Sequence, residues 1–139
     1  MKRSRFTSWL CAMLVLAFAS ANTVTAQQSS SDDALRVIAS QSVSMPESQF
    51  ELTGTNVVLT VLRVNSAMNA STHQGRNNEA TAIALAIAAE FARRGPQYSR
   101  IQSISVDYVE RTGTPAHDTL IDRIDFRKNA AGKFELHIT

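Results

Sequence analysis

The chain has 139 residues, of which 44% are hydrophobic and 19% charged, and its formal net charge is +2. This length fits one domain with a modest core. Its single cysteine, Cys11, lies in an apolar run near the N-terminus, so disulfides and thiol chemistry are excluded for the rest of the chain.

Residues 1–26 are predicted to form a cleavable signal peptide of bacterial type. A basic start is followed by an apolar run over residues 9–19, which is shorter than the about 20 apolar residues that span a bilayer. Cleavage is expected after Ala26, or alternatively after Ala21; an uncleaved anchor is the remaining alternative. We therefore expect a periplasmic or secreted protein without stable membrane insertion after cleavage.

Removal of this leader changes the charge of the protein. Residues 27–139 contain 11 Lys and Arg against 12 Asp and Glu, which leaves a net charge of −1. This balance, together with the lack of aromatic residues interleaved with cations, argues against nucleic acid as a partner.

Residues 27–48 are rich in Ser, Gln and Asp and are predicted to be a mostly flexible N-terminal segment. Residues 33–40 could form one or two helical turns, and Pro46 breaks any regular element. Residues 49–139 are predicted to form a single α+β domain.

The predicted domain begins with a strand over residues 56–64 and continues with a helix over residues 79–94. Asn77 or Asn78 can cap the start of this helix, and Gly95 followed by Pro96 ends it. The predicted core stripe consists of Ala80, Ile83, Ala84, Ile87 and Phe91.

Three further alanines of the helix lie off the core stripe and could admit a second element or a partner. The alternative is that they are exposed and chosen for helix propensity. These alanines are Ala82, Ala86 and Ala89.

Three strands are predicted to follow, over residues 101–109, 120–128 and 133–139. In each strand apolar and polar side chains alternate, which indicates a sheet with one face toward water. The inward residues are expected to be Ile104, Val106, Tyr108, Ile124, Phe126, Phe134, Leu136 and Ile138.

The turn over residues 129–132 predicts the register of the last hairpin. With Gly132 in a left-handed conformation, Asn129 faces Lys133. Counting outward along both strands then pairs Lys128–Phe134, Arg127–Glu135, Phe126–Leu136, Asp125–His137 and Ile124–Ile138.

The predicted fold is therefore α+β, with one helix packed on a four-stranded, mainly antiparallel sheet in the order β-α-β-β-β. This layout resembles cystatin-like folds, but the inhibitory Gln-x-Val-x-Gly turn of cystatins is absent, so protease inhibition is not implied. The pattern Asp125-Phe126-Arg127, Gly132-x-Phe134 and His137-x-Thr139 is similar to that of small uncharacterised exported bacterial proteins, a resemblance that implies no activity.

No catalytic constellation is evident, and no cofactor is expected. His117, Asp118 and Asp122 would need His73 or His137 to complete a metal site, so we interpret His117 as a solvated loop residue.

The weak candidates for ligand binding are Arg76, Asn77 and Asn78, which follow Gly75 ahead of the predicted helix. Free backbone N–H groups with the Arg76 guanidinium could bind an anion there. Ordinary helix capping is the alternative interpretation.

We predict a small exported binding or accessory protein rather than an enzyme. Its partner is expected to be a protein or a small ligand. The alternative is a small periplasmic hydrolase with a site near the 65–78 loop. A closed cleft that gathers His73, Arg76 and an acidic residue would favour the enzyme. A flat polar sheet face and an open edge strand would favour binding by strand addition.

Overall fold

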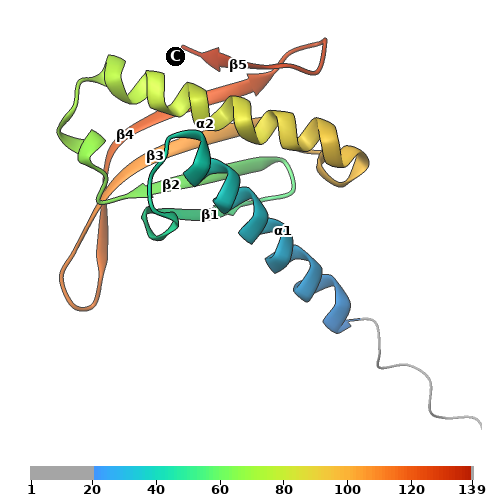
Figure 1. Ribbon diagram of the computed structural model, residues 1–139, viewed down its shortest axis with the longest axis horizontal. Helices are drawn as coiled ribbons and strands as arrows, with labels where there is room; N and C mark the ends of the chain where they lie inside the picture. The colour runs from blue at the N-terminus through green and yellow to red at the C-terminus, as the bar shows by residue number, and fades with distance from the viewer. Residues whose placement is uncertain (1–20, 139) are drawn as a thin grey trace, which may run out of the picture.

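The structure, a computed structural model, describes residues 21–138, with side chains from Ser31 onward. Two helices, α1 (Ala21–Ser42) and α2 (His73–Arg94), lie on one face of a five-stranded sheet (Figure 1). The strands lie side by side in sequence order, and only β2 and β3 are parallel. Their bounds are β1 Phe50–Gly54, β2 Val58–Val64, β3 Ser103–Thr112, β4 His117–Lys128 and β5 Phe134–His137.

The predicted α+β class and the mainly antiparallel sheet are confirmed, whereas the expected single helix and four strands are wrong. Most of the predicted signal peptide lies outside the described residues. Within the described part, none of the helices has the length and apolar character needed to cross a membrane.

The strand that sequence analysis missed is β1, which forms a tight hairpin with β2. Gly54 turns the chain with φ 143°, and a side chain there would place its Cβ 2.1 Å from the carbonyl oxygen of Val58. Thr55 Oγ1 accepts hydrogen bonds from the N–H groups of Val57 and Val58. Glycine and threonine at these positions therefore fix the hairpin.

The prediction that residues 27–48 form a mostly flexible segment is wrong from Ser31 onward. This part of α1 packs against α2 and β1, and the side chains of Leu35 and Ala39 are buried in the core. Its small, polar composition hid the helix, because the burial of two side chains one turn apart depends on tertiary contacts.

Helix α2 begins at His73, six residues before the predicted start, and its N-cap is Thr72, whose Oγ1 accepts the N–H of Gly75 at 3.1 Å. The predicted end at Gly95 is confirmed, since this residue has φ 68° and its N–H bonds to the carbonyl of Phe91. The predicted core stripe is also confirmed. Its five residues are all buried against the sheet.

The alternation of the central strands is confirmed, with Ile104, Val106 and Tyr108 fully buried beneath the helices. The opposite face is polar but not uniformly wet. Asp107, only 5% exposed, lies under the guanidinium of Arg123, whose Nε and Nη2 donate to it at 2.7 and 2.5 Å.

The predicted register of the last hairpin is confirmed for the four pairs from Lys128–Phe134 to Asp125–His137. The expected Ile124–Ile138 contact is wrong, because β5 ends at His137 and Ile138 is 84% exposed. Leu136 shares the face of Phe126 but is exposed as well. The reason is that β5 is the edge strand, at the margin of the helix layer.

Candidate functional site

The predicted candidate Arg76 lies inside α2 rather than ahead of it, and it joins three segments of the chain. Its Nε donates to Oδ2 of Asp122 in β4 at 2.7 Å, and its Nη1 donates to the carbonyl of Ser71 at 2.5 Å. The same Nη1 reaches the carbonyls of Met68 and Asn69. The guanidinium is thus engaged in holding the loop before α2 against the sheet.

The other two candidates, Asn77 and Asn78, also lie within the helix. The Oδ1 of Asn77 is buried without a partner in the described part of the chain, and that of Asn78 accepts the Nε2 of Gln74 at 3.0 Å. The N–H of Arg76 bonds to the carbonyl of Thr72. The backbone donors that the anion-binding interpretation required from residue 76 onward are therefore taken up by the helix.

His73 and Arg76 converge on one acidic residue, as the hydrolase alternative required. His73 Nδ1 lies 2.8 Å from the Asp122 Oδ2 that also accepts Arg76. Burial raises the pKa of Asp122, but the hydrogen bonds from Arg76 and His73 outweigh it and hold this pKa below its usual range. The cluster lies on an open surface, where the His73 side chain is 67% exposed.

Next to this cluster lies a buried polar network that sequence analysis missed. Arg63, fully buried in β2, donates through Nε to Oε1 of Glu79 at 2.8 Å and through Nη2 to Ser66 Oγ at 2.9 Å. Its guanidinium carbon lies 4.2 Å from the ring centre of Phe50. The sequence did contain a sign of this network, because Arg63 is a charged residue at an inward position of an apolar strand.

The hydroxyl of Tyr108 completes this network by donating to the carbonyl of Arg76 at 2.9 Å. Burial, followed by the charge of Glu79, raises the pKa of Tyr108, so the phenol stays protonated. The network is closed on itself and fixes α2 on the sheet.

His117, interpreted as a loop residue, is the exposed first residue of β4. Asp118 beside it accepts the Nε of Arg111 at 2.7 Å, and Arg111 also binds Glu51. Over residues 21–138 no three histidine, cysteine, aspartate or glutamate side chains are grouped as a metal site would need.

An open groove with a volume of about 600 Å³ lies between the C-terminal half of α2 and the β4–β5 hairpin. One wall is the alanine-rich face of α2, and the opposite wall is the ring of Phe134. Phe91 stacks on Tyr98 at its base, with ring centres 4.5 Å apart. The apolar side chains that line it are Leu85, Ala88, Ala89, Phe91, Ala92, Tyr98 and Phe134.

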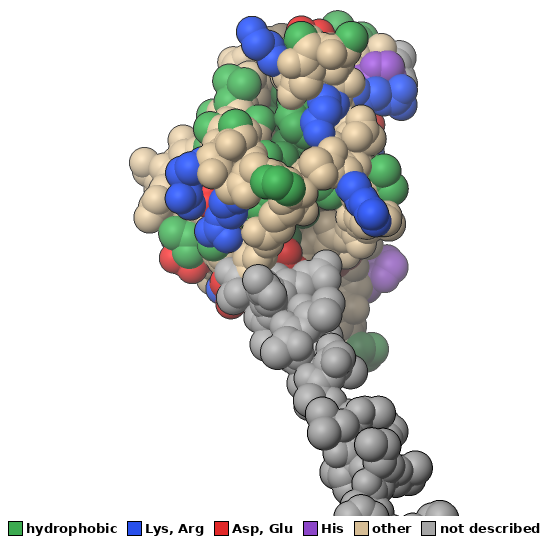
Figure 2. Space-filling view, turned by 90° about the vertical axis from the view of Figure 1, so that its right-hand side faces the viewer, with side chains coloured by type: hydrophobic (Ala, Val, Ile, Leu, Met, Phe, Trp, Pro, Cys, Tyr) green, Lys and Arg blue, Asp and Glu red, His purple; other side chains and the backbone are tan. Residues whose placement is uncertain are grey.

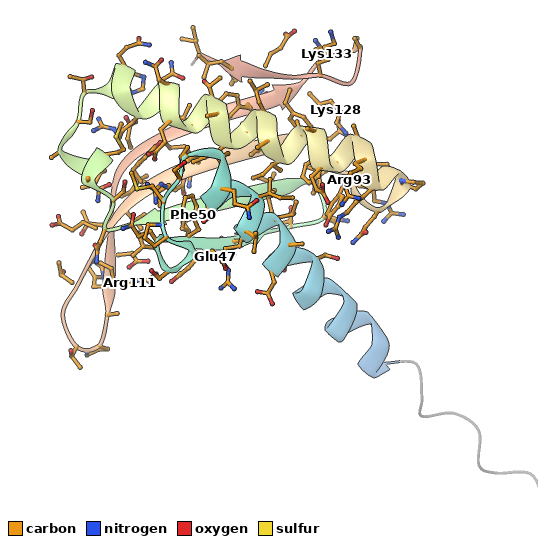
Figure 3. All side chains as sticks on the ribbon, viewed as in Figure 1. Glu47, Phe50, Arg93, Arg111, Lys128 and Lys133 are labelled. Atoms are coloured by element: carbon orange, nitrogen blue, oxygen red, sulfur yellow. The ribbon has the colours of Figure 1, made fainter. Side chains whose placement is uncertain are left out.

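Two lysines line the hairpin side of this groove. Figure 3 shows Lys128 and Lys133 on the hairpin beside the C-terminal half of α2. Lys128 Nζ donates to the carbonyl of Ser99 at 3.3 Å and lies 5.3 Å from the ring centre of Phe134. This bond leaves other protons of the Lys128 ammonium available to a ligand.

One carboxylate also borders the groove, but it is turned away. Glu135 pairs with Arg127 across the hairpin, on the opposite face of the sheet from Phe134, and accepts Asn129 Nδ2 at 2.6 Å. Lys128 therefore lies on the same face of the hairpin as Phe134, whereas Glu135 lies on the other face. Figure 2 shows this end of the molecule, where Lys and Arg side chains surround hydrophobic ones.

The chain matches no protein-family model and no curated protein.

An apolar groove with an ammonium group at one side can hold a molecule that has an apolar body and an anionic end. The His73–Asp122–Arg76 cluster offers a hydrogen-bonded imidazole at the surface, without an enclosing wall.

Proposed function

We propose that this protein is a small exported binding protein that holds an apolar, singly charged anion in the groove between α2 and the β4–β5 hairpin. The observation that carries the proposal is the groove itself, which is lined by alanine and aromatic side chains together with Lys128 and Lys133. Export is proposed on the basic and apolar leader over residues 1–26.

The size of the groove favours a small ligand. Its volume of about 600 Å³ lies within the range of ligand pockets, which is about 300–1,000 Å³. The alanines of α2 leave room where larger side chains would fill it, and Leu85, which is 58% exposed, gains an apolar contact when a ligand lies there.

Charge decides which end group the ligand carries. Lys128 is half-buried and reaches the groove from β4, while Glu135 is held on the far side of the hairpin by Asn129. A carboxylate or sulfonate at this end would accept a hydrogen bond from the Lys128 ammonium, whereas a cation would be repelled.

Calorimetric titration of the purified protein with decanoate tests the proposal, with decyltrimethylammonium as the matched cation. Decanoate should bind and the cation should not. Lys128→Met should weaken decanoate binding roughly tenfold, the effect of one lost charged hydrogen bond. Arg127→Met removes the same charge from the opposite sheet face and should leave binding unchanged.

Equal binding of both detergents, or equal effects of the two substitutions, would contradict the proposed site. Ala89→Phe should fill the groove and abolish decanoate binding, because Ala89 is exposed and lines the apolar wall.

The hydrolase alternative rests on a different observation, the 2.8 Å contact between His73 Nδ1 and Asp122. An Asp-oriented imidazole leaves its Nε2 free to act as a base. Asp122 is shared with Arg76, and no hydroxyl among the described side chains is hydrogen-bonded to His73. We therefore favour the binding protein.

A further inference from the structure

The sheet has an open edge at β5, beyond which no strand lies within residues 21–138. Lys128 donates its N–H to the carbonyl of Gln102, the residue before β3, whereas Asn129 donates its N–H to the carbonyl of Lys133 across the hairpin. Backbone groups of successive strand residues point to alternate sides. Glu135 and His137 therefore turn their backbone groups toward β4, and residues 134, 136 and 138 present theirs to the open edge.

The side chains of this edge are unusually apolar for an exposed strand. Leu136 is 40% exposed and lies on the helix side of the hairpin with Phe134, and Ile138, directly after the strand, is 84% exposed. Edge strands are normally protected by lysine, proline or a bulge. Between Phe134 and Ile138 the chain has neither lysine nor proline, and the pairing of Phe134–His137 with β4 is regular.

We propose that two copies of this chain pair through their β5 edges, antiparallel about a twofold axis at Leu136. Leu136 then exchanges two backbone hydrogen bonds with the partner's Leu136. Phe134 pairs in the same way with the partner's Ile138. The result is one continuous sheet across the dimer with the helices of both copies on the same face.

Backbone geometry and charge together select this register. Edge-facing residues must pair with edge-facing residues, and more than one such pair forms between residues 134–138 of the two copies only with the twofold axis at residue 135, 136 or 137. An axis at Glu135 sets this carboxylate against itself, and an axis at His137 sets two histidines together. The axis at Leu136 places Glu135 beside the partner's His137 on both sides, in the closely spaced type of pair.

The same register buries the exposed apolar side chains. Leu136 meets the partner's Leu136, and Phe134 meets the partner's Ile138, all on the helix side of the sheet. Because the interface uses the same patch on both copies, it closes as a dimer and does not extend into a filament.

Cysteine cross-linking tests the pairing and its register at once. In a Cys11→Ser background, Leu136→Cys, Glu135→Cys and His137→Cys are oxidised at low protein concentration and separated without reductant. A hydrogen-bonded pair has a Cα separation of about 5.5 Å, within the about 4.4–6.8 Å of a disulfide. Residues 135 and 137 lie about 8 Å from their own counterparts in this register, too far for a bond.

Only Leu136→Cys is expected to give a cross-linked dimer. Preferential cross-linking at position 135 or 137 would overturn the register, and no preference among the three would overturn edge pairing altogether.

Sedimentation equilibrium of the unmodified chain gives a second readout. Leu136→Lys should weaken the dimer at least about tenfold, whereas Leu120→Lys replaces another exposed leucine, in β4 and outside the β5 edge, and should not. Glu135→Lys sets a lysine beside the partner's His137 and should also weaken the dimer. Adding His137→Glu to it should restore association. A monomer at every concentration, or equal effects of the two leucine substitutions, would overturn the proposal.

Discussion

Arg63 and Glu79 form an ion pair inside the core, with Arg63 Nε 2.8 Å from Glu79 Oε1 and side-chain exposures of 0% and 9%. The pair links β2 to α2, so it fixes the helix on the sheet. Its remaining donors reach Ser66 Oγ and Gln49, and the ring of Phe50 covers the guanidinium. Removing one member of such a buried ion pair is costly, because the other charge is then left buried without a partner.

Glu79→Ala is expected to lower the free energy of unfolding by about 3–5 kcal/mol, because it leaves the Arg63 charge buried and unpaired. The double variant Arg63→Met/Glu79→Leu should recover much of that loss, since apolar side chains of similar volume replace both charges. Urea unfolding of the two proteins measures the difference. If the double variant is less stable than Glu79→Ala, the charges themselves stabilise the fold and our reading of the pair is wrong.

Glu90 gives the end of α2 a dependence on pH. Hydrogen bonds from Arg93 and then Arg94 lower its pKa from an ordinary 4.5 to about 2. Since the folded pKa lies below the unfolded one, the stabilisation is present above about pH 4.5 and is lost as the pH falls toward 2.

Thermal melts of the native protein and Glu90→Gln between pH 7 and 2 check this sign. The native protein should melt higher at neutral pH, and the gap should narrow below about pH 4.5. A gap that is unchanged at pH 2 would show that the carboxylate charge does not stabilise the helix end.

Gly95 ends α2 with φ 68° and ψ −127°, a conformation that side chains rarely adopt. No atom outside the local backbone and the two neighbouring residues lies within 4 Å of the position that a Cβ would take, so the cost of a side chain there is conformational. Gly95→Ala should therefore destabilise the protein by about 1 kcal/mol in urea melts. An unchanged midpoint would mean that the backbone relaxes at this position without cost.

His73 and Arg76 share Asp122 but differ in burial, with His73 67% exposed and Arg76 12% exposed. His73→Ala should change the unfolding free energy by less than about 0.5 kcal/mol. Arg76→Met should cost about 1–3 kcal/mol, since three carbonyls and a carboxylate lose their donor. Neither should affect decanoate binding, which is measured in the same samples. Loss of a hydrolytic activity in His73→Ala at unchanged stability would instead support the enzyme.

The parts of the fold that sequence predicted are those fixed by local patterns. The β4–β5 register followed from the alternation of Ile124 and Phe126 with charged residues and from a turn ending in Gly132. The end of α2 followed from Gly95. These features depend on residues that are close together in the sequence, so the sequence alone is enough to predict them.

The missed parts depend on contacts between distant segments. Helix α1 is stabilised by the burial of Leu35 and Ala39 against α2 and β1, and β1 is a five-residue strand that exists only as the partner of β2. The groove illustrates the same limit. Ala89 was singled out as a surface that could admit a partner, but only the folded hairpin places Lys128 opposite it.

The most direct test of the groove is the amide spectrum of ¹⁵N-labelled protein titrated with decanoate. We expect shifts concentrated at the amides of Ala88, Ala89, Gly132 and Phe134, on both walls of the groove, and little change at His73 or Asp122. Shifts centred on His73, or none at saturating decanoate, would contradict the account that this protein binds an apolar anion between α2 and the β4–β5 hairpin.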